Sequence, residues 1–276
     1  MIQNIQKGIL HMEMINPQEW KKDLPAFKEK TDRFYAGELS KADYKGFSGG
    51  YGSYAQKDGK ASMIRLRMAG GHLTKDKLKF IADSIKTYNV DKVHLTTCQA
   101  IQLHNLQPEA IYGIMEGGLD HGIVTMGGGG DFPRNVTVSP LSGVQKGEYF
   151  NVLPYAEAAG EYLMTFIKKE VMPRKLKVGF SNGPANETHA TFRDLGFVAR
   201  EDGNFDVYSA GGLGNNARFG LKVAENVKPE KIRYYICAMR ETFIAHGNYK
   251  QRGRARTRYM QETLGEEGYI KAFHEK

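Results

Sequence analysis

The chain has 276 residues, 41% of them hydrophobic, which is enough for one large domain or two smaller ones with packed cores. It contains no apolar run long enough to span a bilayer and no apolar stretch before a cleavage site near its start, so we expect neither a membrane partner nor a signal peptide. Two cysteines, Cys98 and Cys237, exclude a disulfide framework and favour a cytoplasmic location, while a net charge of +8 favours an anionic partner.

The first half of the chain predicts a ferredoxin-like unit. We expect helices over 18–34, 74–88 and 107–118 and strands over 61–69 and 121–126, and Thr74 can cap the second helix. Residues 93–104 alternate as one long strand, or as two strands with a kink. The apolar face of this alternation would carry Val93, Leu95, Ile101 and Leu103, and the polar face His94, Thr96, Cys98, Gln102 and His104.

The second half predicts a mixed α/β unit. A loop over 125–143 contains four consecutive glycines, 127–130. We expect a helix over 154–171, a strand over 174–180, a helix over 186–195, a strand over 206–210 and helices from 229 to the end. The fold class is therefore α+β, with a boundary near 148–154.

Two cation pairs stand beside apolar residues of these strands. Arg65 and Arg67, and later Lys175 and Lys177, are spaced i, i+2, so each pair shares one strand face. Exposed strands commonly carry such pairs. Arg134, which follows the glycine run, and the polar face of 93–104 make a shared anionic cavity the more attractive interpretation.

Other sites are less well supported. The glycine run lacks the Lys-Ser/Thr of a phosphate loop, although its amides could form an anion nest. A zinc site from Cys98, His94 and His104 is disfavoured because strand neighbours at i and i+4 lie about 13 Å apart, and an iron–sulfur cluster needs about four thiolates. The basic stretch 247–259 could bind nucleic acid or form a solvated helix face.

Six segments together resemble the sirohaem-dependent nitrite and sulfite reductases. In chain order they read RLRMAGGHLT, VHLTTCQAIQLHN, GGGGDFPRNVTVSPLSG, MPRKLKVGFSNG, AGGLGNNARFG and HGNYKQRGRARTRYMQETLGEEGYIKAF. The resemblance implies an N-terminal arm (1–50), a ferredoxin-like half-domain of these reductases (51–147) and their first haem-binding module (148–276). It reduces the nucleic-acid interpretation to a minor one, so we expect no nucleic-acid partner.

The resemblance also implies residue roles. Arg65, Arg134, Lys175 and Lys177 would surround an anionic substrate, nitrite or sulfite, neutralise it and supply protons. We expect no protein ligand to a metal. The carboxylates of sirohaem need cationic and polar partners, and the resemblance implies that the remaining residues bind them. These are Arg67, His94, Thr96, Cys98, Gln102, His104, Asn135, Arg174, Arg254 and Arg256, with Cys98 at a position where the family usually has arginine.

The same resemblance implies an incomplete enzyme. Members of the family carry a second, related half with four cysteines for a [4Fe-4S] cluster, and this chain matches the first half. We therefore expect the N-terminal half or a subunit of a reductase, which needs a cluster-bearing second half or self-association and an external electron donor. The alternative is a non-catalytic sirohaem- or tetrapyrrole-binding protein.

Overall fold

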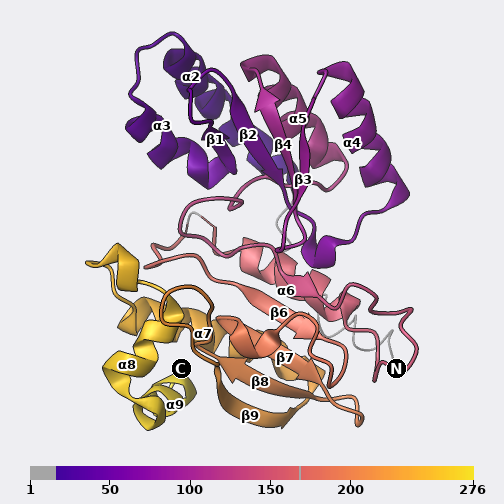
Figure 1. Ribbon diagram of the computed structural model, residues 1–276, viewed down its shortest axis with the longest axis vertical. Helices are drawn as coiled ribbons and strands as arrows, with labels where there is room; N and C mark the ends of the chain where they lie inside the picture. Colours follow the sequence, from indigo (N-terminus) through magenta and orange to yellow (C-terminus); the bar gives the residue numbers. More distant parts are fainter. Residues whose placement is uncertain (1–16, 168) are drawn as a thin grey trace. The chain divides into compact units, whose positions relative to one another are not determined.

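The computed structural model describes residues 17–167 and 169–276. The described chain divides into two compact units, an N-terminal unit that ends at Phe132 and a C-terminal unit that runs from Pro133 to Lys276 (Figure 1). The two compact units meet between residues 132 and 133. The boundaries expected at residues 50 and 147 are those of family modules rather than of compact units, and they stay predictions.

The N-terminal unit is built on a four-stranded antiparallel sheet in the order β1-β2-β4-β3. Its apolar core joins the inner faces of β2 and β4 to the helices, with Ile64, Leu66 and Leu103 fully buried. In chain order the elements are η1 (Pro17–Asp23), α2 (Leu24–Tyr35), α3 (Lys41–Ser48), η2 (Gly49–Tyr51), β1 (Ser53–Ala55), β2 (Ser62–Leu66), η3 (Ala69–Gly71), α4 (Lys75–Thr87), β3 (Val93–Leu95), β4 (Ile101–Leu106) and α5 (Pro108–Asp120).

Local chemistry explains where these helices begin. The Thr74 side chain accepts a hydrogen bond from the Lys77 amide, which confirms the cap predicted for α4. Ser40 caps α3 in the same way through the Asp43 amide. Pro108 stands in the first turn of α5, where its missing N–H costs no helical hydrogen bond.

The C-terminal unit has a five-stranded mixed sheet in the order β5-β6-β7-β8-β9. Strands β5, β6 and β7 are parallel, and β7, β8 and β9 are antiparallel. Phe180 and Phe197 stack at 4.7 Å in the core. The elements are β5 (Thr137–Val138), α6 (Leu153–Met164), β6 (Val178–Ser181), η4 (Ala190–Phe192), β7 (Leu195–Ala199), β8 (Phe205–Ser209), β9 (Leu221–Val227), η5 (Pro229–Lys231), α7 (Ile232–His246), η6 (Arg252–Arg254), η7 (Thr257–Tyr259), α8 (Met260–Leu264) and α9 (Glu266–His274).

Several predicted elements are wrong. The helix expected over 186–195 is a short 3-10 turn, η4, followed by β7, whose residues pair with β6 and β8. The strand expected over 121–126 reduces to one isolated bridge between Arg67 and Val124. The strand expected over 174–180 begins at Val178, and α6 ends at Met164 rather than near 171. The helix α3 and the strand β9 were not predicted.

Residues 93–104 form a hairpin rather than one long strand. Strands β3 and β4 pair antiparallel across a turn at 96–100. The register pairs Val93 with Leu103 and Leu95 with Ile101, so these four side chains share one sheet face as predicted. Only Ile101 and Leu103 enter the core, while Val93 and Leu95 are 44% and 74% exposed. The β3 part of this apolar face is exposed rather than buried, because β3 is the end strand of its sheet.

Candidate functional site

A polar rung crosses three strands of the N-terminal sheet. Arg65 on β2 is the direct partner of Gln102 on β4, and Gln102 is the direct partner of His94 on β3. Directly opposed residues share one sheet face, so the register gathers three of the predicted site residues on one side of the sheet.

Gln102 links Arg65 to His104. With its amide oxygen turned toward Arg65, Gln102 accepts from Nε at 3.1 Å and from Nη2 at 2.7 Å, and its amide nitrogen donates to His104 Nε2 at 3.2 Å. Burial, and then the nearby cations Lys92 and Arg65 and the ring of His94, lower the pKa of His104. Near neutral pH His104 is therefore an uncharged acceptor, and Arg65 carries the fixed positive charge of the rung.

The glycine run is locked inside the N-terminal unit. The amides of Gly127, Gly128 and Gly130 donate to the Gly50 carbonyl, the Thr125 carbonyl and the Tyr54 hydroxyl. Because three of the four amides of the run already have partners, these three are not available to the anion nest that the sequence allowed. The run serves instead as a tight packing segment.

The two arginines of β2 contact this segment. Arg65 Nη1 donates to the Gly128 carbonyl, and Arg67 Nη1 donates to the Met126 carbonyl at 2.8 Å. Arg67 is only 5% exposed. Its guanidinium therefore supports the loop, and cofactor binding by Arg67 stays a prediction.

Thr96 and Cys98 lie in the turn between β3 and β4, not on a strand face. The Thr96 hydroxyl accepts from the Ala100 amide at 3.1 Å, which closes the turn. Cys98 is partly buried. Their predicted cofactor contacts are not tested by this geometry.

A second cationic group occupies the C-terminal unit and centres on Lys175. Leu176 bridges Pro133, and the Arg134 amide donates to the Leu176 carbonyl at 2.8 Å, so Arg134 runs beside the lysine pair. Burial, and then the positive charges of Arg134, Lys177, Arg256 and Arg174, lower the pKa of Lys175 to about 8. Five of the predicted site residues thus act on one another electrostatically within this unit.

A buried carboxylate that the sequence analysis missed joins this group. Asp194, which precedes β7, has no exposed side-chain surface and accepts from Arg256 Nη2 at 2.9 and 3.0 Å. It also accepts from the Lys177 amide at 2.7 Å and from the Thr257 hydroxyl. Its only sequence signal is an acid directly before an apolar run, which is a common pattern in turns.

Two other predicted residues have different surroundings. Arg254 is 55% exposed and pairs with Glu262 at 2.6 Å, and Asn135 is buried.

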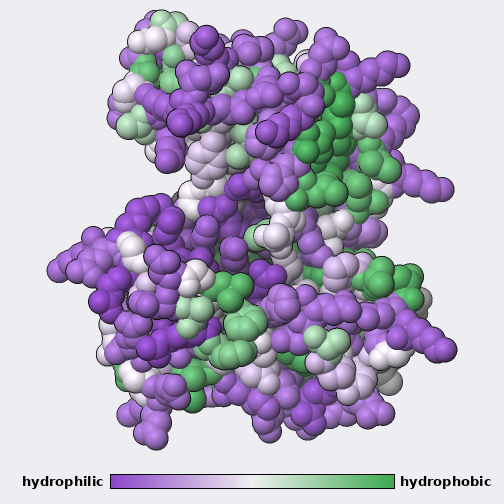
Figure 2. Space-filling view, viewed as in Figure 1, coloured by the Kyte–Doolittle hydropathy of each residue, from purple (hydrophilic) through white to green (hydrophobic). Residues whose placement is uncertain are grey.

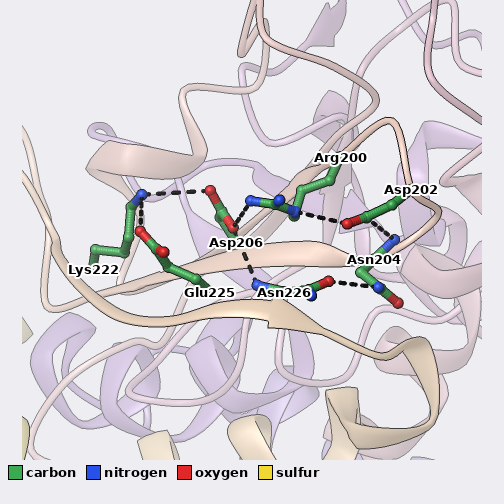
Figure 3. Close-up of polar contacts among 7 residues, drawn as sticks. All are labelled: Arg200, Asp202, Asn204, Asp206, Lys222, Glu225 and Asn226. Atoms are coloured by element: carbon green, nitrogen blue, oxygen red, sulfur yellow. Dashed lines mark hydrogen bonds and ion pairs between the residues drawn. The ribbon is translucent and has the colours of Figure 1, made fainter.

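A contrasting polar network covers β8 and β9, where Asp206 pairs with both Arg200 and Lys222 and where Glu225 also pairs with Lys222 (Figure 3). There opposite charges alternate, whereas four positive charges act on Lys175.

Comparison with known proteins identifies the family of this chain. Residues 129–276 match the family described as "Nitrite and sulphite reductase 4Fe-4S domain", and residues 54–118 match "Nitrite/Sulfite reductase ferredoxin-like half domain". The chain belongs to the sirohaem-dependent nitrite and sulfite reductase family. The expected α+β fold with a ferredoxin-like half-domain is thereby confirmed.

Named relatives include both kinds of reductase. The chain is 31% identical over 238 residues to the assimilatory ferredoxin-dependent nitrite reductase of Haloferax mediterranei, covering 79% of this chain and 41% of the relative. It is 26% identical to a sulfite reductase [NADPH] hemoprotein beta-component of Nitrosomonas eutropha, covering 74% and 41%. The chain thus spans less than half the length of these curated relatives.

A solved structure shares the fold. The Mycobacterium tuberculosis NirA protein superposes with a TM-score of 0.76 at 23% identity, covering 96% of this chain and 52% of NirA. A dissimilatory sulfite reductase I structure superposes with a TM-score of 0.63 at 12% identity, covering 77% of this chain and 69% of its own.

The donor set fits one family cofactor and not the other. Sirohaem presents carboxylates, which suit the cations around Lys175 and the Arg65 rung. A [4Fe-4S] cluster needs about four thiolates, and the chain has two cysteines, Cys98 in the N-terminal unit and Cys237 in the C-terminal unit. Within the described ranges no group of three His, Cys, Asp or Glu side chains could hold a metal ion, and no helix could cross a membrane.

Proposed function

We propose that this chain is the sirohaem-binding half, or a subunit, of a reductase that converts nitrite or sulfite in six electrons. The observation that carries the proposal is the cationic group around Lys175, in which burial and four positive neighbours lower the lysine pKa to about 8. Cations gathered against their mutual repulsion, and partly out of water, are typical of a site whose ligand is an anion.

Each side chain has a role in this proposal. Arg134, Lys177 and Arg65 bind the oxyanion and offset its charge. Lys175 Nζ is mostly protonated near pH 7, and its lowered pKa makes it a better proton donor than an exposed lysine as N–O or S–O bonds break. Arg174 and Arg256, with His94 and Gln102, bind cofactor carboxylates. Bound sirohaem would supply the redox chemistry at the substrate.

The cluster would come from elsewhere. The chain's two cysteines are too few for it, so we place the four thiolates on a second half, a partner chain or a copy-to-copy assembly. The names of the relatives indicate ferredoxin or NADPH as electron donor. By itself the chain would show no six-electron reduction. The cysteine count also favours one alternative function, that of a cytoplasmic sirohaem carrier without catalysis.

An open sheet edge supports association. Strand β3 is the last strand in its sheet, and all three of its residues are exposed. Figure 2 shows hydrophobic side chains gathered on this side of the unit, where β3 and α4 carry the exposed Leu95, Val93 and Leu78. Unpaired backbone groups beside exposed apolar side chains are suited to pairing with another strand.

Titration with sirohaem, followed by its absorption spectrum, tests the proposal. Lys175→Met should weaken binding of the macrocycle or of added sulfite at least tenfold, because it removes a charge from the centre of the group. Lys222→Met is the matched control, since Lys222 is a cation of the same unit that pairs with Asp206 and Glu225. A wild-type chain that binds neither sirohaem nor sulfite would disprove the proposal.

A further inference from the structure

The buried carboxylate of Asp194 has an unusual place for an acid in a site built for anions. It lies next to Arg256 and to the backbone of Lys177. Its negative charge therefore reduces the positive charge of a site whose proposed ligands are anions. A carboxylate without exposed surface is also costly to bury unless its hydrogen bonds are complete. Its retention beside the cations needs a physical reason.

The hydrogen bonds supply that reason. Asp194 accepts four times, from Arg256 Nη2 through both oxygens, from the Lys177 amide and from the Thr257 hydroxyl. These donors come from two segments distant in sequence, the stretch before β6 and the C-terminal stretch 256–257. One carboxylate therefore connects the cations of both stretches to the start of β7.

The Asp194 backbone fixes its own position equally firmly. Its carbonyl accepts from the Ala210 amide at 2.9 Å and from the Ser209 hydroxyl at 3.3 Å, at the end of β8. The next residue, Leu195, donates to the Lys177 carbonyl at 3.2 Å. The anchor is thus part of the rigid sheet, which is the best support for a preorganised binding group.

We infer that Asp194 is the positioning residue of the cationic site, holding the Arg256 guanidinium and the Lys177 backbone in the arrangement that receives a polycarboxylate or oxyanion ligand. The inference rests on the proposed function and deepens it. Arg256 contacts the carboxylate through Nη2, and its Nε is buried without a hydrogen-bond partner in the described part of the chain. Thr257 is a second positioning residue, since its hydroxyl completes the carboxylate's hydrogen bonds.

An effect of charge alone and an effect of positioning predict opposite changes in ligand affinity for Asp194→Asn. Removing a negative charge from a cationic site should tighten binding of an anionic ligand if electrostatics alone matters. Loss of the anchor should weaken it, by about tenfold, as is common for residues that orient binding groups. The measurement is the affinity of the full chain for sirohaem, titrated by absorption well below the unfolding temperature of each variant.

Asp206→Asn is the matched control. Asp206 is a carboxylate of the same sheet that also pairs with an arginine and a lysine and accepts from a backbone amide (Figure 3). It changes the net charge equally, and it should leave the affinity within about twofold of wild type.

A second pair of variants keeps the inference testable if Asp194→Asn does not fold. Thr257→Val removes one donor to Asp194 without a change of charge, and Thr257→Ser retains it. We expect a several-fold loss of affinity for valine and near wild-type affinity for serine. Unchanged or tighter binding in folded Asp194→Asn, or equal affinities for the two Thr257 variants, would overturn the inference. Absence of binding by the wild type would overturn the proposed function instead.

Discussion

At the scale of single residues, the pKa values of two titratable side chains, His104 and Lys175, are shifted by their surroundings. Burial and nearby positive charges lower the pKa of both His104 and Lys175. A base with a lowered pKa is less protonated in the folded state than in the unfolded chain, so its contribution to stability is lost as pH falls. For His104 that loss occurs below its usual pKa of about 6.5.

The Arg65 rung makes a prediction about His104. Arg65→Met removes one of the positive charges that lower the pKa of His104, so this pKa should rise toward its usual value. NMR titration of the histidine ring protons measures it. Lys21→Met, which breaks the exposed pair with Asp120, is the control and should leave the His104 titration unchanged. A pKa for His104 that falls or stays constant in Arg65→Met would contradict this interpretation of the rung.

Residue identity predicted part of the site. Leu176 and Val178 are buried, as their alternation with Lys175 and Lys177 predicts. The spacing of Arg65 and Arg67 did not reveal that Arg67 would be buried under the Met126 carbonyl. Asp194 could not be found at all, because its partners lie 17 and more than 60 positions away.

At the scale of elements, the glycine run has a structural role that can be tested. A Cβ on Gly129 would lie 2.1 Å from the Tyr54 hydroxyl and 2.3 Å from the Gly49 carbonyl. Gly129→Ala should therefore destabilise the protein by about 1–3 kcal/mol, as overpacking does. Chemical denaturation measures the change in the free energy of unfolding.

Gly46→Ala is the matched control. Gly46 lies inside α3, and nothing stands within 4 Å of the added Cβ. Alanine is the better helix former, so this change should be neutral or stabilise by up to about 1 kcal/mol. Equal stability of the two variants would show that the glycine run is not packed as described.

The edge strand makes a second prediction at this scale. A lysine on an exposed edge opposes pairing with another strand, so Leu95→Lys should shift the chain from an associated to a monomeric form in sedimentation velocity. Leu213→Lys changes an exposed leucine of the C-terminal unit instead and should leave association intact. A wild-type chain that sediments as a monomer would rule out self-association through β3.

Element prediction failed where long-range pairing decides. Residues 186–195 have a helical pattern, but the strand pairing of Leu195–Ala199 with β6 and β8 takes precedence. Val93 and Leu95 alternate correctly for a half-buried strand, yet β3 is an edge strand with an exposed apolar face. Helices with strong caps, such as α4 after Thr74, were predicted closely because their signals are local.

At the scale of the whole molecule, the cations that we propose to bind anions form one group in each of the two units. Each unit contributes its own group, the Arg65 rung in one and the Lys175 group in the other. The chain spans about half of the NirA structure that it resembles. Under the proposed function, the chain's two cysteines are too few for the cluster, so a second half or a partner would supply it.

The most direct test of the central claim is the pH dependence of anion binding. Nitrite remains an anion well above neutral pH, so its affinity for the full chain, measured by calorimetry from pH 6 to 10, reports the charge of the protein. Lys175 is protonated below its pKa of about 8 and loses its charge above it. Affinity should hold to about pH 7 and fall through pH 8 in the wild type, and stay flat over that interval in Lys175→Arg. A wild-type affinity that does not change between pH 7 and 9 would contradict the claim.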